Sequence, residues 1–218
     1  DASSGNFVPT LTAALETSAP DTQLFSELLA RIPPSEQLPG SLLFKALDIK
    51  NNAISALLIA RTPNINIRNE HNETLFYHAL DAGFEDIVLE LIARGADITQ
   101  PGVSGSSAIT RAVRHNMAKV VAMLLDKGAS ADQKTPEGYT LAEMCVYSGY
   151  PETLEILLSR NVKIEKEFSL LWAIRDGKGK AAPVLLAHGA VPDIMNQDGT
   201  PAITLAAEAG QVEAVQAF

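Results

Sequence analysis

The strongest constraint on this chain is a short sequence that recurs at a nearly constant step. The stretch 58–65 (LIARTPNI) returns as 91–98 (LIARGADI), and related stretches begin after the same step at Leu124 and again at Leu157. A further copy begins at Leu185 after a shorter step, and an upstream copy begins at Leu28. Self-similarity at a fixed period of about 33 residues indicates a repeat architecture, in which each unit stacks on its neighbours.

Each recurring stretch ends a segment with the apolar spacing of two helices. In the copy around Gly83, apolar residues recur three and four positions apart in 74–80 and again in 87–92. This spacing predicts two helices that are each buried on one face. Gly83 and Gly95 fall where these helices must end, because glycine readily adopts the left-handed conformation that closes a helix. Isolated helices of this length are marginal in water, so each predicted pair needs a neighbour.

These copies resemble the ankyrin repeat family. The family pattern places T-P-L-H-x-A at the start of a first helix, I-V-x-x-L-L in the second helix and G-A-D after it. The last copy contains Asp198-Gly199-Thr200-Pro201, and 85–97 reads EDIVLELIARGAD. The resemblance covers nearly the whole chain and implies one all-α solenoid domain over 1–218, with about seven helix-turn-helix units. The predicted units span about 8–34, 41–67, 69–100, 101–132, 133–164, 165–193 and 194–218.

Several copies depart from the pattern. The G-A-D position is occupied by residues 32–34 (IPP) and 62–64 (TPN) in the first two units, which we therefore interpret as degenerate, and the last unit reads as truncated. The unit at Glu165 is five residues short, which we assign to the loop before Phe168. The last unit reads as one residue longer than its counterparts when Thr200 is aligned with Thr74. The chain begins without methionine and ends within a predicted helix, so we expect a longer native protein.

Composition excludes several classes of function. The chain has 17 basic and 26 acidic side chains, a formal net charge of −9 and 46% hydrophobic residues, as in a globular protein. Acidic surfaces disfavour nucleic acid, whose phosphates are neutralised by basic residues. No apolar run approaches the roughly 20 residues that span a membrane. Cys145 is the only cysteine, so neither an internal disulfide nor a cysteine-rich zinc site is possible, and its alignment with Ala79 predicts a buried small side chain.

Catalytic and cofactor-binding motifs are absent from the sequence. We find no G-x-S-x-G, H-E-x-x-H, P-loop or dinucleotide-binding pattern. The histidines lie in different units without the i, i+4 pairing of a metal site: they are His71, His78, His115 and His188. We therefore predict that the chain is not an enzyme and has no cofactor, no metal site and no small-molecule substrate.

The resemblance implies that loop tips and exposed positions of the first helices select the partner on a concave face. The first-helix positions, taken as the two residues before each closing turn, are Asp81, Ala82, Arg114, His115, Tyr147, Ser148, Arg175, Asp176, Glu208 and Ala209. The loop tips are His71, Glu73, Val103, Ser104, Glu137 and Tyr139. Because tyrosine and arginine are enriched where binding energy concentrates, we rank Tyr139, Tyr147, Arg114 and Arg175 first. The alternative is that each is an ordinary solvated side chain.

Trp172 is the only tryptophan and falls in the first helix of the shortened unit. The favoured interpretation is that it fills space left by the missing loop residues. A binding anchor on the open face is the alternative.

The function predicted from the resemblance is that of an interaction module or scaffold that binds another protein through its concave face. The alternative is a structural or autoinhibitory segment of a longer protein whose activity lies outside this chain. We expect a soluble protein without membrane or nucleic-acid partners. A cytoplasmic location is favoured, with delivery into a host cell as an alternative for a bacterial protein.

Overall fold

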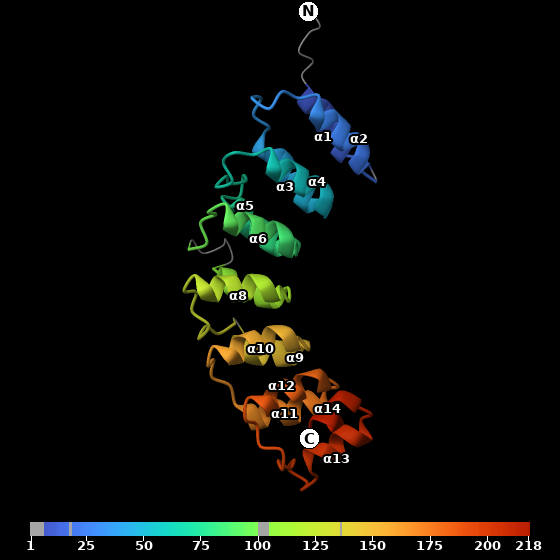
Figure 1. The fold of residues 1–218 in the computed structure, drawn as a ribbon, viewed down its shortest axis with the longest axis vertical. Helices are drawn as coiled ribbons and strands as arrows, with labels where there is room; N and C mark the ends of the chain where they lie inside the picture. The colour runs from blue at the N-terminus through green and yellow to red at the C-terminus, as the bar shows by residue number, and fades with distance from the viewer. Residues whose placement is uncertain (1–6, 18, 100–104, 136) are drawn as a thin grey trace, which may run out of the picture. The chain divides into compact units, whose positions relative to one another are not determined.

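A computed structural model describes residues 7–17, 19–99, 105–135 and 137–218, and their regular structure is helical. Contacts divide the chain into two compact units, 1–108 (unit 1) and 109–218 (unit 2). The helices follow one another in antiparallel pairs joined by short turns (Figure 1). The predicted all-α repeat fold is therefore confirmed, whereas the prediction of a single domain stays a prediction.

The described residues of unit 1 form three helix pairs. They are α1 (Phe7–Leu15) with α2 (Thr22–Ala30), α3 (Gly40–Asp48) with α4 (Asn52–Ala60), and α5 (Leu75–Ala82) with α6 (Glu85–Ala93).

The described residues of unit 2 form four helix pairs, although Ala108, the first residue of α7, falls in unit 1. They are α7 (Ala108–Arg114) with α8 (Ala118–Asp126), α9 (Leu141–Ser148) with α10 (Pro151–Ser159), α11 (Lys166–Arg175) with α12 (Ala182–Ala187), and α13 (Ala202–Glu208) with α14 (Val212–Ala217). A short 3₁₀ helix, Gly179–Ala181, leads into α12.

The core of each unit is built from residues that recur with the repeat. One small residue of each first helix from α3 onward is completely buried, where helices approach closely: Ala46, Ala79, Ala112, Cys145, Ala173 and Ala206. The leucine that begins each recurring stretch is also fully buried from the second copy onward: Leu58, Leu91, Leu124, Leu157 and Leu185. Burying a leucine side chain contributes roughly 1.5–3 kcal/mol, so these positions stabilise the stack, as predicted, and Cys145 is one of the buried small residues.

Local caps explain where the helices begin and end. Thr74 accepts a hydrogen bond from the Tyr77 amide at the start of α5, and Thr140 forms a capping box with Glu143 at the start of α9. Such caps satisfy amides that the first turn leaves unpaired. Gly83 ends α5 at a φ of 87°, a left-handed conformation that only glycine adopts without penalty.

In the parts of the chain that the structure describes, hairpin-like loops precede three of the first helices. Each is closed by an isolated antiparallel bridge, between Arg68 and Thr74, Lys134 and Thr140, and Met195 and Pro201. The last bridge aligns Pro201, not Thr200, with Thr74, and α13 begins directly after Pro201. The prediction of an extra residue in the last unit is therefore wrong, because its hairpin loop has the same length as the loop before α5.

The shortened unit lacks such a hairpin among the described residues. The connection between α10 and α11 comprises only residues 160–165, whereas 127–140 connect α8 to α9. Helix α11 starts at Lys166, before the predicted loop would have ended at Phe168. The connection before α11 is therefore shorter than its counterpart before α9, and Lys166 and Glu167, which were expected in the loop, are helical.

Candidate functional site

An aromatic cluster lies on α9 and α11, the first helices of two successive pairs in unit 2. Tyr139 comes from the hairpin before α9, Tyr147 from the last turn of α9, and Phe168 and Trp172 from α11. The Tyr139 and Tyr147 ring centroids are 4.5 Å apart, and the Tyr147 and Trp172 centroids are 4.0 Å apart in an edge-to-face arrangement. Phe168 lines a small pocket together with Tyr147 and Trp172. We call these four residues the aromatic cluster.

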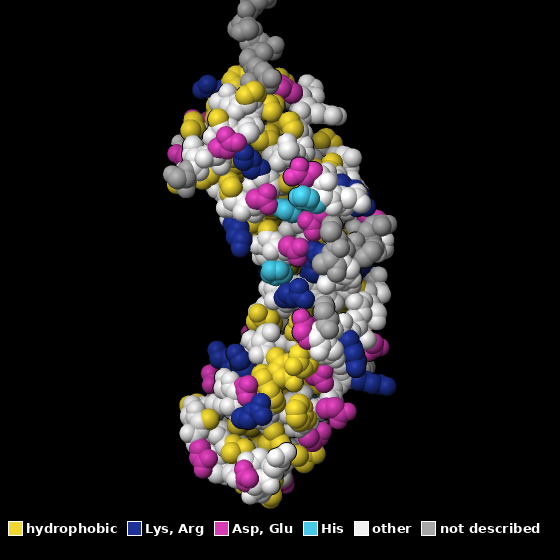
Figure 2. Space-filling model, turned by 180° about the vertical axis from the view of Figure 1, so that it is seen from behind, with side chains coloured by type: hydrophobic (Ala, Val, Ile, Leu, Met, Phe, Trp, Pro, Cys, Tyr) yellow, Lys and Arg dark blue, Asp and Glu magenta, His cyan; other side chains and the backbone are white. Residues whose placement is uncertain are grey.

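The aromatic cluster is accessible to a partner. Tyr139 is 42% exposed and Phe168 is 61% exposed, while Tyr147 and Trp172 are half-buried. Figure 2 shows hydrophobic side chains gathered on the face of unit 2 that is turned to the viewer. Aromatic side chains that are held in place by one another lose little conformational freedom on binding, which favours them as binding anchors.

A groove between α11 and α13 adjoins the aromatic cluster. It has a cavity volume of about 600 Å³, and this size is typical of sites that take up side chains or small ligands. Its lining residues are Phe168, Leu171, Trp172, Ile174, Arg175, Asn196, Gln197, Asp198, Leu205, Glu208 and Ala209. The groove thus combines an apolar floor with charged residues at its margins.

Charged residues surround the Tyr147 side chain. Burial is the main cause that raises the pKa of Tyr147, and Tyr139 and Glu143 raise it further, whereas Arg175 lowers it. Arg175 Nε lies 2.7 Å from Asp176 Oδ1 in an exposed ion pair. Tyr147 therefore stays neutral at physiological pH and offers an aromatic ring with a hydroxyl group.

Neighbouring groups lower the pKa of Glu137 in the hairpin before α9. The pKa of Glu137 is below its ordinary value, with the side chain of Thr135 as the largest cause and a smaller attraction from the Arg114 guanidinium. Glu137 and Arg114 are both exposed, as is His115. These predicted site residues thus lie on the hairpin and helix end that precede the aromatic cluster.

The remaining predicted residues are placed less favourably or lie in unit 1. Ser148 is half-buried at the end of α9. In unit 1, His71 and Asp81 are exposed, but Glu73 Oε2 lies 3.0 Å from His78 Nδ1, so its carboxylate already has a partner within the fold. Val103 and Ser104 lie outside the described residues.

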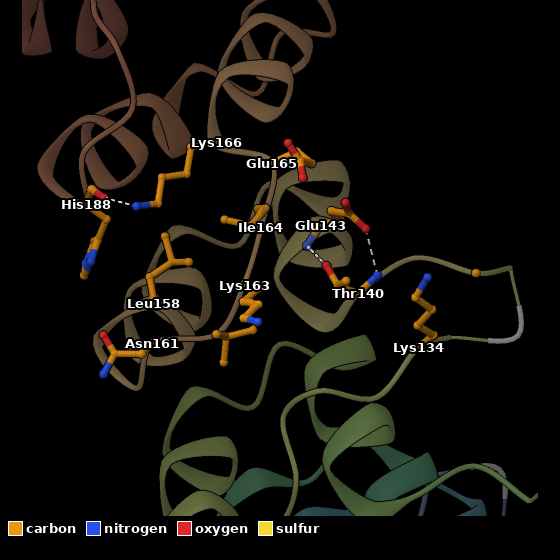
Figure 3. A pocket seen from close by; sticks show the side chains of 12 residues that line it. Lys134, Thr140, Glu143, Leu158, Asn161, Lys163, Ile164, Glu165, Lys166 and His188 are labelled. Atoms are coloured by element: carbon orange, nitrogen blue, oxygen red, sulfur yellow. Dashed lines mark hydrogen bonds between the residues drawn. The ribbon is translucent and has the colours of Figure 1, made fainter.

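The shortened connection before α11 borders an open cavity. A polar cavity of about 780 Å³ remains open between the 134–140 hairpin and residues 161–166, and Trp172 is not among its lining residues (Figure 3). Lys166 and Glu143 line this cavity but already form hydrogen bonds: Lys166 Nζ donates to the His188 carbonyl, and Glu143 accepts from the Thr140 amide. Trp172 instead contacts Tyr147 of the preceding repeat and lines a groove with 196–198 of the following hairpin, so both sequence interpretations of Trp172 stay predictions.

Sequence reasoning also missed Phe168, Leu205 and Asp198 as residues of this surface. Phe168 and Trp172 are four residues apart and so share one helix face, which was a usable signal. Leu205 and Asp198 carry no comparable signal, because only the packing of α13 against α11 brings them to the groove.

Within the described parts of the chain, no helix has both the length and the apolar character needed to cross a membrane. Within the same parts, no three histidine, cysteine or carboxylate side chains come together as a metal site.

Comparison with known sequences identifies related proteins. The family model described as ankyrin repeats (3 copies) matches residues 12–135. A putative ankyrin repeat protein of Rickettsia bellii is 28% identical over 138 residues, which are 54% of this chain and 20% of that protein. The ankyrin repeat protein nuc-2 of Neurospora crassa is 28% identical over 172 residues, 75% of this chain and 16% of that protein. The chain therefore spans a fifth or less of the length of these relatives.

Solved structures show the same architecture. The human ASB11 ankyrin repeat domain has a TM-score of 0.55 and 25% identity, with 80% of each chain covered. An ankyrin repeat domain from Acinetobacter baumannii has a TM-score of 0.53 and 22% identity over 80% of this chain and 94% of that one. A chain in the structure of a predatory endopeptidase from Bdellovibrio bacteriovorus in complex with an immunity protein has a TM-score of 0.50 and 23% identity, with 80% and 95% covered. The last two similarities concern the fold alone.

Proposed function

This chain belongs to the ankyrin repeat family, whose domains generally mediate protein–protein interaction, and from that premise we propose that it binds a partner protein through the aromatic cluster of unit 2. The observation that carries the proposal is the packing of Tyr139, Tyr147 and Trp172 into one partly exposed surface on the first helices. Trp172 belongs to the repeat that follows the one containing Tyr139 and Tyr147, so the surface exists only when the two repeats are stacked.

Physical chemistry supports this choice of surface. Binding energy in protein interfaces concentrates in a few residues, among which tryptophan, tyrosine and arginine are enriched. Tyr147 lies between Tyr139 and Trp172, and Arg175 lies beside the groove that adjoins them. An exposed phenylalanine such as Phe168 costs free energy in water that a partner recovers by covering it.

The test is a capture experiment that compares variants of the complete chain. The immobilised chain is incubated with a lysate from its source, and bound proteins are quantified for the parent chain, Tyr147→Ala and Phe168→Ala. We expect each substitution to weaken capture of the same partner about tenfold or more, because truncating a hot-spot residue costs about 2 kcal/mol.

Val212→Ala on α14 is the matched control, because Val212 is also 61% exposed but lies outside both the aromatic cluster and the groove. Thermal unfolding verifies that all variants fold. A partner that binds all three variants as tightly as the parent chain would refute the proposed surface.

A further inference from the structure

The α11–α13 groove has negative charge near both ends of α13. Asp198 belongs to the hairpin that precedes α13, and Glu208 is the last residue of α13. Both residues are exposed and line the groove. Among the described residues, neither carboxylate takes part in an ion pair.

The one basic residue that lines the groove is already paired. Arg175 Nε lies 2.7 Å from Asp176 Oδ1, so this pair is close to neutral as a whole. The negative charges of Asp198 and Glu208 are therefore uncompensated by the other lining residues. The formal net charge of the chain, −9, has the same sign.

The floor between these carboxylates is apolar. Leu171, Trp172 and Leu205 are half-buried, while Phe168 is largely exposed beside them. An apolar side chain gains free energy by entering such a floor. A tryptophan ring also attracts a nearby lysine or arginine side chain.

We propose that the α11–α13 groove binds a basic segment of the partner protein, with an apolar side chain on the floor and lysine or arginine side chains directed to Asp198 and Glu208. The proposal rests on the proposed function and specifies the chemical class of the partner segment. An acidic segment would be repelled at both carboxylates, and a neutral segment would gain no ion pair with them. Complementary charge contributes specificity and accelerates association.

Short peptides provide the probe, because Trp172 is the only tryptophan and its fluorescence reports occupancy of the groove. Three peptides are titrated into the complete chain at low ionic strength: acetyl-Lys-Leu-Phe-Leu-Lys-amide, the same sequence with glutamine in place of lysine, and the same with glutamate. We expect the basic peptide to bind about tenfold more tightly than the neutral one, through two additional exposed ion pairs. The acidic peptide should bind most weakly.

The variant that isolates the charges is the double substitution Asp198→Asn and Glu208→Gln. It should reduce the preference for the basic over the neutral peptide to about twofold or less, because the described groove lining then has no carboxylate left to pair with the lysine side chains. Glu213→Gln on α14 removes one carboxylate of the same unit outside the groove and should leave the preference unchanged.

The outcomes separate this proposal from the proposed function. If basic and neutral peptides bind equally and Phe168→Ala weakens both, the aromatic surface stands and the basic partner class is overturned. A preference that survives in the double variant, or stronger binding of the acidic peptide, overturns it as well. If no peptide changes the Trp172 emission, the groove is not the binding site for a basic segment, while the capture experiment with Tyr147→Ala still decides the proposed function.

Discussion

Arg61 connects successive helix pairs in unit 1, and its replacement by alanine should destabilise that unit. The guanidinium group donates hydrogen bonds to the carbonyl oxygens of Leu29 and Ile32 at 3.1 Å each and of Pro33 at 3.0 Å. These carbonyls lie at the end of α2 and in the turn after it. The last carbonyls of a helix lack their usual partner within the helix. The Ile32 amide donates to the Leu29 carbonyl, and Arg61 adds a second, charged donor there.

The size of the effect follows from the burial of the acceptors. Leu29 and Ile32 are buried, whereas Pro33 is exposed and its carbonyl can turn to water. A hydrogen bond to a charged group contributes about 1.5–3 kcal/mol, but Arg61 is itself half-buried and water replaces part of each bond. We therefore count about 1 kcal/mol for each buried acceptor and expect Arg61→Ala to lower the free energy of unfolding by about 2 kcal/mol.

Urea unfolding followed by far-ultraviolet circular dichroism measures this loss. With a slope of about 2 kcal/mol per molar urea, the midpoint should fall by about 1 M. Arg31 occupies the same repeat position in the first pair but is exposed, and its side chain makes no hydrogen bond or ion pair with the described residues. Arg31→Ala should therefore change stability by less than about 0.5 kcal/mol. Equal shifts for Arg31→Ala and Arg61→Ala would refute the role of the carbonyl contacts.

Three further substitutions or reactions test the packing of unit 2. Gly179→Ala should lower the free energy of unfolding by about 2 kcal/mol, because the new Cβ would lie within 3.0 Å of Gln211 Cβ, and a neutral change in the urea midpoint would contradict the crowding. Thr140→Ala removes the capping box with Glu143 and should cost about 1 kcal/mol, measured by thermal unfolding with Thr140→Ser as the conservative control. Burial raises the pKa of the Cys145 thiol, so the native protein should not react with Ellman's reagent until urea unfolds it. Rapid labelling of the folded chain would contradict this burial. The raised pKa also means that folding favours the neutral thiol, so this contribution to stability should be fully present below the ordinary thiol pKa and should decrease as the pH rises above it.

The sequence was sufficient to predict the repeat, its helix pairs and most of the buried core residues. The constant step between copies established which positions are equivalent, and equivalent positions such as Ala79 and Cys145 are equally buried. Local signals located helix ends, since Gly83 closes α5 as its position predicted. These features are local, because the apolar spacing along a helix already indicates which face of that helix is buried.

The candidate site could be predicted only in part. Tyr139, Tyr147 and Arg175 were identified from their repeat positions, and the structure brings them to one surface or its margin. Glu73 was also selected by position, but its contact with His78 depends on rotamers that no sequence pattern specifies. The placement of Trp172 depends on how α11 packs against α9 after a connection that lacks the usual loop.

The sequence by itself therefore determined the repeated unit, its helical faces and the residues that must be buried, because these depend on periodicity within each segment. The tertiary structure alone decided that Tyr147 contacts Trp172 and that Asp198 and Glu208 border one groove. Tyr147 and Trp172 come from different repeats, and the groove joins Asp198 and Glu208 of the last repeat to α11 of the repeat before it. The step from Leu157 to Leu185, which encloses Trp172, is also shorter than the steps before it. Contacts between stacked repeats depend on the offset and rotation of whole helices, which are set by the packing of many side chains at once.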